Sequence, residues 1–145
     1  MTMSKKEEVQ NILKDFFSEK TQVIFVYLFG SFVKRERYRD LNIGVYMKPL
    51  PDLIQQGKLE SELEELVPMR IDLILLNETP EKNPAFAYEV LTEGELLVNK
   101  NPALHTNFKS KAFRYYFDTA YLRENINQAF QKRLESGNFG MRNYE

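Results

Sequence analysis

Two kinds of hydrophobic pattern alternate along this chain of 145 residues. Apolar positions three or four residues apart are typical of one face of a helix, and they occur in four segments: 4–20, 52–67, 84–94 and 102 onward. Continuous or alternating apolar runs are typical of strands, and they occupy 23–29, 40–46, 70–76 and 95–99. Because the two kinds alternate, the pattern predicts an α/β fold in which helices back a small sheet.

Short polar motifs mark where several of these elements begin and end. Ser4 with Glu7 can form a capping box at the start of the first helix, and Asp52 can cap the second. Asn83 precedes a proline and suits the start of the third helix, whereas Gly94 suits its end. The intervening segment 30–39 is polar and basic, so we expect a loop that joins the first two strands.

The composition supports one globular domain and narrows its chemistry. Hydrophobic residues make up 43% of the chain, which is enough for a core and argues against disorder. The absence of cysteine excludes a disulfide framework, a thiolate zinc site and a cysteine nucleophile. The sequence has no signal-peptide-like or membrane-spanning apolar segment, so we expect a cytoplasmic protein without a membrane partner. A net charge of −1 gives no general reason to expect direct binding of nucleic acid.

The first strand ends at Gly30-Ser31, where the sequence suggests phosphate binding. Glycine permits close approach of the backbone to a phosphate, and the Ser31 hydroxyl can donate a hydrogen bond to its oxygens. Taken alone, these two residues favour the alternative of a plain turn at the end of a strand.

A basic segment follows this turn. Its charged residues give a local charge of +3 and are Lys34, Arg35, Glu36, Arg37 and Arg39. Such a cluster can attract a nucleoside triphosphate or an RNA end. The alternative is a solvated loop, which charge clusters commonly are.

Three polar positions on the next strands can hold a divalent cation. Asp40 and Asn42 are two residues apart on a strand and therefore share one face, where their oxygens can bind Mg²⁺. Asp72 interrupts an apolar run, so we expect its carboxylate to be buried and to have a partner. That partner is either a metal or a hydroxyl to be deprotonated, or simply Arg70 in an ion pair. A solvated strand face remains the alternative for Asn42.

These features, in this order, resemble the minimal nucleotidyltransferase (MNT) family of the DNA polymerase β superfamily. The matching residues are Gly30-Ser31-Phe32, Asp40-Leu41-Asn42-Ile43, Arg70-Ile71-Asp72-Leu73 and the segment from Phe86 to Leu97. The resemblance implies a nucleotidyltransferase (polymerase β palm-like) fold: a small mixed sheet, helices packed on it and a long C-terminal helix. It also implies a nucleotidyltransferase-like domain over residues 1–100, with 101–145 as its helical extension.

The same resemblance implies roles for individual residues. Asp40 and Asp72 are the expected catalytic residues, and Asp40, Asn42 and Asp72 are the expected Mg²⁺ ligands. The expected nucleotide-binding residues, with ATP as substrate, are Gly30, Ser31, Lys34 and Arg35. Asn42 stands where the family has a second aspartate, which removes one charge from the site and weakens the expected metal binding.

Members of this kind resemble antitoxins that neutralise HEPN-type ribonuclease toxins, some by AMP transfer to a tyrosine of the toxin. One hypothesis is therefore an adenylyltransferase that modifies such a partner. The second is a catalytically degenerate module that neutralises the toxin by binding alone. A third, transfer of a nucleotide to a small molecule, is disfavoured because the sequence shows no second substrate-binding domain.

The last helix suggests where a protein partner binds. Its apolar stripe spans more turns than the body can cover and consists of Phe108, Ala112, Tyr115, Thr119, Leu122, Ile126 and Phe130. We expect part of this stripe to be open and to bind the toxin. A homo-oligomer is also compatible with the sequence. The alternative is packing within the molecule along the whole helix.

Overall fold

The computed structural model describes residues 4–34 and 40–136. Its elements run in the order α1 (Lys5–Ser18), β1 (Val23–Phe29), α2 (Ser31–Lys34), β2 (Asp40–Met47), α3 (Leu53–Leu66), β3 (Arg70–Leu75), α4 (Thr79–Lys82), α5 (Pro84–Glu93), β4 (Glu95–Asn99) and α6 (Pro102–Ser136). The helices and strands predicted from the hydrophobic pattern are all present, so the α/β prediction is confirmed.

The described strands form a single mixed sheet with the order β3-β2-β1-β4. β1 pairs antiparallel with both β2 and β4, whereas β2 and β3 are parallel because α3 carries the chain back between them. β1 therefore lies inside the sheet, and its sequence is apolar on both faces because residues from each face are buried in a separate core. β3 is an edge strand, and this position matters for the candidate site.

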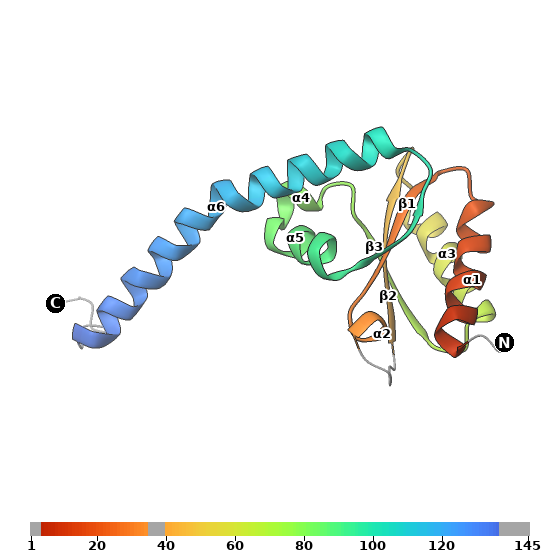
Figure 1. The fold of residues 1–145 in the computed structure, drawn as a ribbon, viewed down its shortest axis with the longest axis horizontal. Helices are drawn as coiled ribbons and strands as arrows, with labels where there is room; N and C mark the ends of the chain where they lie inside the picture. The colour runs from red at the N-terminus through yellow and green to blue at the C-terminus, as the bar shows by residue number, and fades with distance from the viewer. Residues whose placement is uncertain (1–3, 35–39, 137–145) are drawn as a thin grey trace.

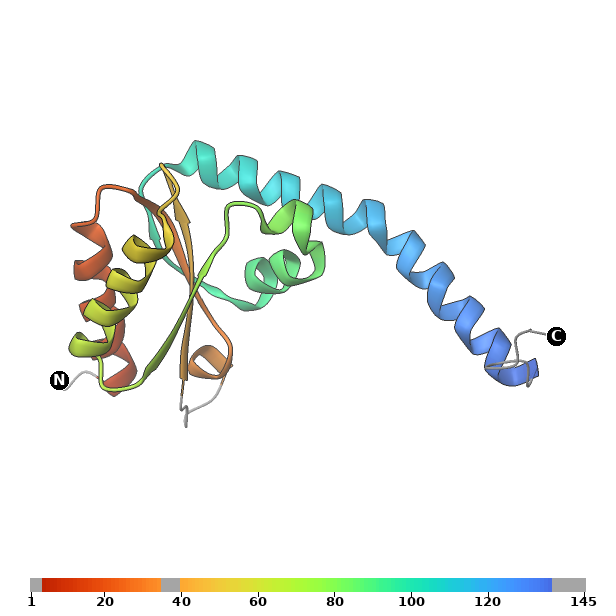
Figure 2. The ribbon, with the colours of Figure 1, turned by 180° about the vertical axis from the view of Figure 1, so that it is seen from behind.

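Helices cover the two faces of the sheet in separate layers (Figures 1 and 2). α1 and α3 pack on one face over a core that includes Val26, Leu28, Leu41 and Ile43. On the other face, Val90 of α5 and Phe108 of α6 pack with Phe25, Tyr27 and Leu76 in a second core. Alternate strand residues thus enter two different cores.

A buried polar network fixes the start of α6 to the sheet. His105 is 6% exposed, and its Nε2 lies 2.7 Å from the hydroxyl of Tyr27. Asn99 Nδ2 donates to His105 Nδ1 at 3.3 Å, while Asn99 Oδ1 accepts from the Asn101 backbone. His105 therefore carries its proton on Nε2 and is neutral.

One local feature differs from the sequence-based expectations. Residues 31–34 form a short helix in which the Val33 and Lys34 amides both donate to the Gly30 carbonyl, rather than the start of a loop. At α1, Ser4 accepts from the Glu7 amide as expected. α3 runs without a break through Gly57, as the predicted helical segment 52–67 requires, because a glycine in a helix interior costs only about 1 kcal/mol.

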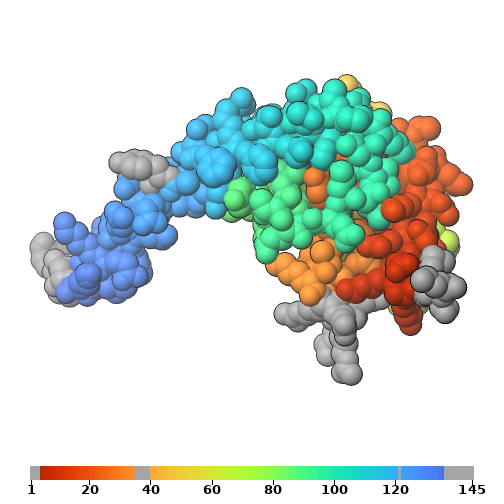
Figure 3. Space-filling model, viewed as in Figure 1, coloured from red at the N-terminus to blue at the C-terminus, as the bar shows by residue number. Residues whose placement is uncertain are grey.

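α6 extends well beyond the rest of the molecule (Figure 3). Its first part packs on α4 and α5, where Tyr116 stacks on Tyr88 with ring centroids 3.9 Å apart. Farther along, Leu122 and Ile126 are 59% and 60% exposed. The expectation that part of the stripe is open is therefore confirmed, and packing within the molecule along the whole helix is wrong. In the described ranges, every helix is too short or too polar to cross a membrane.

Candidate functional site

Strand register brings the predicted site residues onto one face of the sheet. Asn42 pairs with Asp72 across the parallel β2–β3 ladder, and Asp40 pairs with Arg70 two residues earlier. On the other side of β2, Asn42 pairs with Phe29, the residue before Gly30. Asn42 therefore lies between the Gly30 turn and Asp72.

The alternation of side chains confirms that Asp40, Asn42 and Asp72 share this face. Their neighbours Leu41 and Ile43 are buried in the core beneath α1 and α3. Residues two apart on a strand point to the same side, so the three polar side chains point away from that core. The sequence-based grouping of Asp40, Asn42 and Asp72 is thus reproduced by the geometry.

The expectation that Asp72 is buried is wrong. Its side chain is exposed, whereas Ile71 and Leu73 on either side are buried. The physical reason is that β3 is an edge strand whose second face is open at this end, so the carboxylate remains hydrated. Within residues 4–34 and 40–136, the structure shows no ion pair between Asp72 and Arg70. The carboxylate of Asp72 is therefore accessible to a ligand.

Gly30 and the Asn42 side chain are packed together. Gly30 has a φ of +82°, the left-handed region that favours glycine. A Cβ atom at this position would overlap Nδ2 of Asn42 and would lie 3.3 Å from its Cγ. Both the backbone conformation and the close approach of Asn42 therefore require glycine here.

The other predicted phosphate-binding residues surround this turn. Ser31 is half-buried at the start of α2. The Lys34 ammonium at the end of α2 lies 2.8 Å from a carboxylate oxygen of Glu93, with both side chains 49% exposed. To bind a phosphate directly, Lys34 would exchange this exposed ion pair for the ligand, at a small cost. Arg35, Arg37 and Arg39 lie outside the described residues.

Glu93 is a charged neighbour of the site that the sequence reasoning missed. It is the last residue of α5, and its ion pair with Lys34 places the end of this helix beside α2. Nothing in the local sequence around Glu93 indicates this contact, because it depends on how α5 packs against the sheet.

The donor atoms on this face suit one Mg²⁺ ion better than two. Asp40 and Asp72 supply two carboxylates, and Asn42 supplies a neutral amide. Among the described residues, no group of three or more His, Cys, Asp or Glu is placed to hold a metal. Mg²⁺ commonly takes one or two protein carboxylates and completes its octahedron with phosphate oxygens and water. The two carboxylates and the amide would therefore fit a single Mg²⁺ that takes its remaining ligands from other oxygen atoms.

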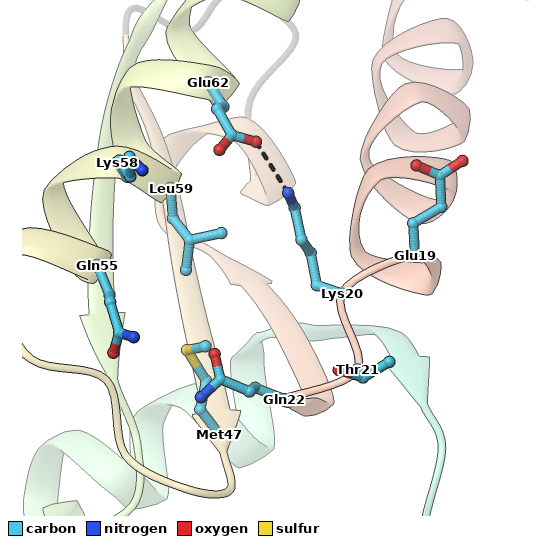
Figure 4. Close-up of a pocket in the computed structure, with 9 residues that line it drawn as sticks. All are labelled: Glu19, Lys20, Thr21, Gln22, Met47, Gln55, Lys58, Leu59 and Glu62. Atoms are coloured by element: carbon cyan, nitrogen blue, oxygen red, sulfur yellow. Dashed lines mark hydrogen bonds and ion pairs between the residues drawn. The ribbon is translucent and has the colours of Figure 1, made fainter.

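A pocket of about 270 Å³ lies at a different place (Figure 4). It is lined by the α1–β1 turn, the end of β2 and α3, with Met47 and Leu59 as its apolar part. Lys20 and Glu62 form an ion pair of 2.9 Å across it. Met47 is at the opposite end of β2 from Asp40, so this pocket contains none of the predicted site residues.

Residues 11–103 match the family described as Polymerase beta, Nucleotidyltransferase. This match spans more than half of the chain, and the chain therefore belongs to the polymerase beta nucleotidyltransferase family. The predicted nucleotidyltransferase fold is thereby confirmed. No curated protein matches the chain by sequence.

Several solved structures share this fold over nearly the whole chain. One, a tri-AMPylated HEPN toxin from Shewanella oneidensis in complex with an MNT antitoxin, has a TM-score of 0.68 at 20% identity and covers 87% of this chain and 98% of the matched chain. The toxin–antitoxin MntA–HepT gives a TM-score of 0.62 at 20% identity, with 87% and 96% covered. A toxin–antitoxin with AMP-PNP gives 0.60 at 18% identity, with 90% and 99% covered. At these identities the likeness establishes a common fold.

Proposed function

We propose that this protein is a nucleotidyltransferase-fold antitoxin that neutralises a HEPN-type ribonuclease toxin. The observation that carries the proposal is the extent of the structural likeness, which includes 87% of this chain and 98% of a chain from a HEPN–MNT complex. The family match to residues 11–103 and the grouping of Asp40, Asn42 and Asp72 on one sheet face support it. We infer a cytoplasmic location, because ATP and the RNA that such a toxin cleaves are found there.

In the active form of this proposal, the chain transfers AMP from ATP to a hydroxyl of the toxin. Gly30, Ser31, Lys34 and Arg35 bind the triphosphate, and Asp40 and Asp72 hold Mg²⁺. When bound, the ion supplies positive charge that orients the phosphates and stabilises the charge that develops on them.

Asp72 accepts the proton of the attacking hydroxyl. The hydroxyl oxygen forms a bond to the α-phosphorus. The bond between the α-phosphorus and the oxygen that links it to the β-phosphorus breaks, and pyrophosphate leaves. The exposure of Asp72 supports this role, because a substrate can reach its carboxylate.

The second candidate is neutralisation by binding alone, and Asn42 favours it. A neutral amide replaces the family's second aspartate, so two carboxylates remain in the site. Two Mg²⁺ ions that lie close together repel each other and need more negative charge than these two carboxylates supply. The projecting part of α6 serves either candidate, since Leu122 and Ile126 offer exposed apolar contacts to a protein partner.

Intact-mass spectrometry of a purified HEPN-domain protein from the same genome, incubated with this chain and Mg-ATP, tests the proposal. The active form predicts a mass gain equal to one or more AMP groups, which Asp72→Asn abolishes. Asn42→Asp is expected to increase the transfer, because it supplies the missing carboxylate ligand. Binding without any mass gain supports the second candidate. A HEPN-domain protein that is neither bound nor modified contradicts both.

A further inference from the structure

The amide group of Asn42 has an unusual position for a metal ligand. Outside the immediate chain neighbours of Gly30, the amide nitrogen of Asn42 is the atom nearest to the position that a Cβ on Gly30 would occupy. Asn42 is half-buried and lies beside Phe29 on one strand and Asp72 on the other. The donor end of the amide therefore faces the turn that precedes Ser31.

This donor has no protein partner within residues 4–34 and 40–136, where the structure shows no hydrogen bond of the Asn42 side chain. Asn77 is a useful contrast, because its Nδ2 donates to the Met47 carbonyl at 2.8 Å and its Oδ1 accepts from the Met47 amide. Partly buried amides are normally hydrogen-bonded. The Asn42 amide is thus free to bind a ligand at the Gly30 turn.

We propose that Asn42 donates an amide hydrogen bond to a phosphate oxygen of the bound nucleotide, in a place where an aspartate would need a Mg²⁺ ion between itself and that phosphate. This inference rests on the proposed nucleotide site. The amide N–H supplies a donor to an anion, which is among the stronger classes of hydrogen bond. Asn42 accordingly lowers the metal requirement of nucleotide binding.

The proposal makes a specific statement about charge. With Asn42, the groups beside the bound nucleotide are the carboxylates of Asp40 and Asp72 and one hydrogen-bond donor. With aspartate at position 42, they are three carboxylates. Only a cation relieves the repulsion between this third carboxylate and the phosphates. The identity of residue 42 therefore determines how strongly nucleotide binding depends on Mg²⁺.

Calorimetric titration of ATP into the full chain, in Mg²⁺ and in EDTA, tests this role. In EDTA we expect Asn42→Asp to weaken binding about tenfold or more, the size of one hydrogen bond to a charged group. In Mg²⁺ we expect this difference to disappear or to reverse. Asn42→Leu, which removes the donor without adding charge, is expected to weaken binding about tenfold under both conditions.

Asn107→Asp provides the matched control, because Asn107 is exposed on α6 and lies outside the site. Thermal unfolding of each variant verifies that the fold is kept. If Asn42 instead holds a metal through its oxygen, Asn42→Leu binds ATP as tightly as the wild type in EDTA and more weakly than the wild type in Mg²⁺ alone. That result, or the absence of ATP binding by every variant, overturns the inference. Binding of this chain to the HEPN-domain protein is measured in a separate experiment. If that binding is observed while the inference about Asn42 fails, the proposed function still stands.

Discussion

At the scale of single residues, Gly30 shows how the backbone shapes the candidate site. Its φ of +82° costs other residues about 1–2 kcal/mol, and a Cβ would also overlap Asn42. We therefore expect Gly30→Ala to lower the free energy of unfolding by about 2 kcal/mol or more, measured by urea denaturation. Adding Asn42→Ala removes the overlap, so the double variant should lose less stability than the two single losses added together. Strict additivity would show that the two residues do not press on each other.

His105 makes the stability of the protein depend on pH. Burial, and secondarily the charge of Lys109, lowers the pKa of His105 below its ordinary value of 6.5, so the folded state binds the proton less readily than the unfolded state. The free energy of unfolding therefore contains a part that depends on His105 being neutral. This part is fully present above pH 6.5 and is lost progressively as the pH falls from 6.5 towards the folded-state pKa. Burial also raises the pKa of Tyr27 to about 12. The Tyr27 hydroxyl, which contacts His105, therefore stays neutral over the pH range in which His105 titrates.

We accordingly expect the melting temperature to fall below pH 6.5, and His105→Gln to reduce this dependence. Because His105 is the only histidine in the sequence, its NMR signals report the folded-state pKa without ambiguity. A folded-state pKa at or above 6.5 would contradict this explanation.

At the scale of elements, α6 combines a packed part with an open part. Leu122 and Ile126 lie one helical turn apart on the open part and are 59% and 60% exposed. We expect Leu122→Ser with Ile126→Ser to weaken toxin binding about thirtyfold or more, since apolar anchors of an interface contribute about 2 kcal/mol or more. Biosensor titration against the HEPN-domain protein measures this loss.

The matched control is Gln128→Ser, because Gln128 is exposed on the opposite face of the same helix. The melting temperature of the free protein should stay nearly constant in all these variants, because none of the replaced side chains is buried. A double variant that still binds the toxin at full strength would place the docking surface elsewhere.

Most elements could be predicted from the sequence because each has a clear period and a local end signal. Asp52 and Asn83 cap α3 and α5 through side-chain hydrogen bonds to the backbone, as expected from their positions before the helices. The short helix α2 could not be predicted, since four residues carry no period. The exposure of Asp72 was also unpredictable, because the same apolar neighbours occur in edge and interior strands.

At the scale of the whole molecule, the candidate site depends on topology rather than on any single motif. The sequence identified Asp40, Asn42 and Asp72, and strand alternation placed the first two on one face. Only the parallel β2–β3 register shows that Asp72 lies directly beside Asn42. The pairing of Lys34 with Glu93 likewise requires the packed structure, because it joins two elements distant in the chain.

The central claim, that this protein is an antitoxin of a HEPN-type ribonuclease, is tested most directly by the toxin's own activity. RNA cleavage by a purified HEPN-domain protein from the same genome can be followed with and without an equimolar amount of this chain, in the presence of Mg-ATP. We predict that cleavage is suppressed by this chain and restored in part by Leu122→Ser with Ile126→Ser. Undiminished cleavage in the presence of the folded wild-type chain would contradict the claim.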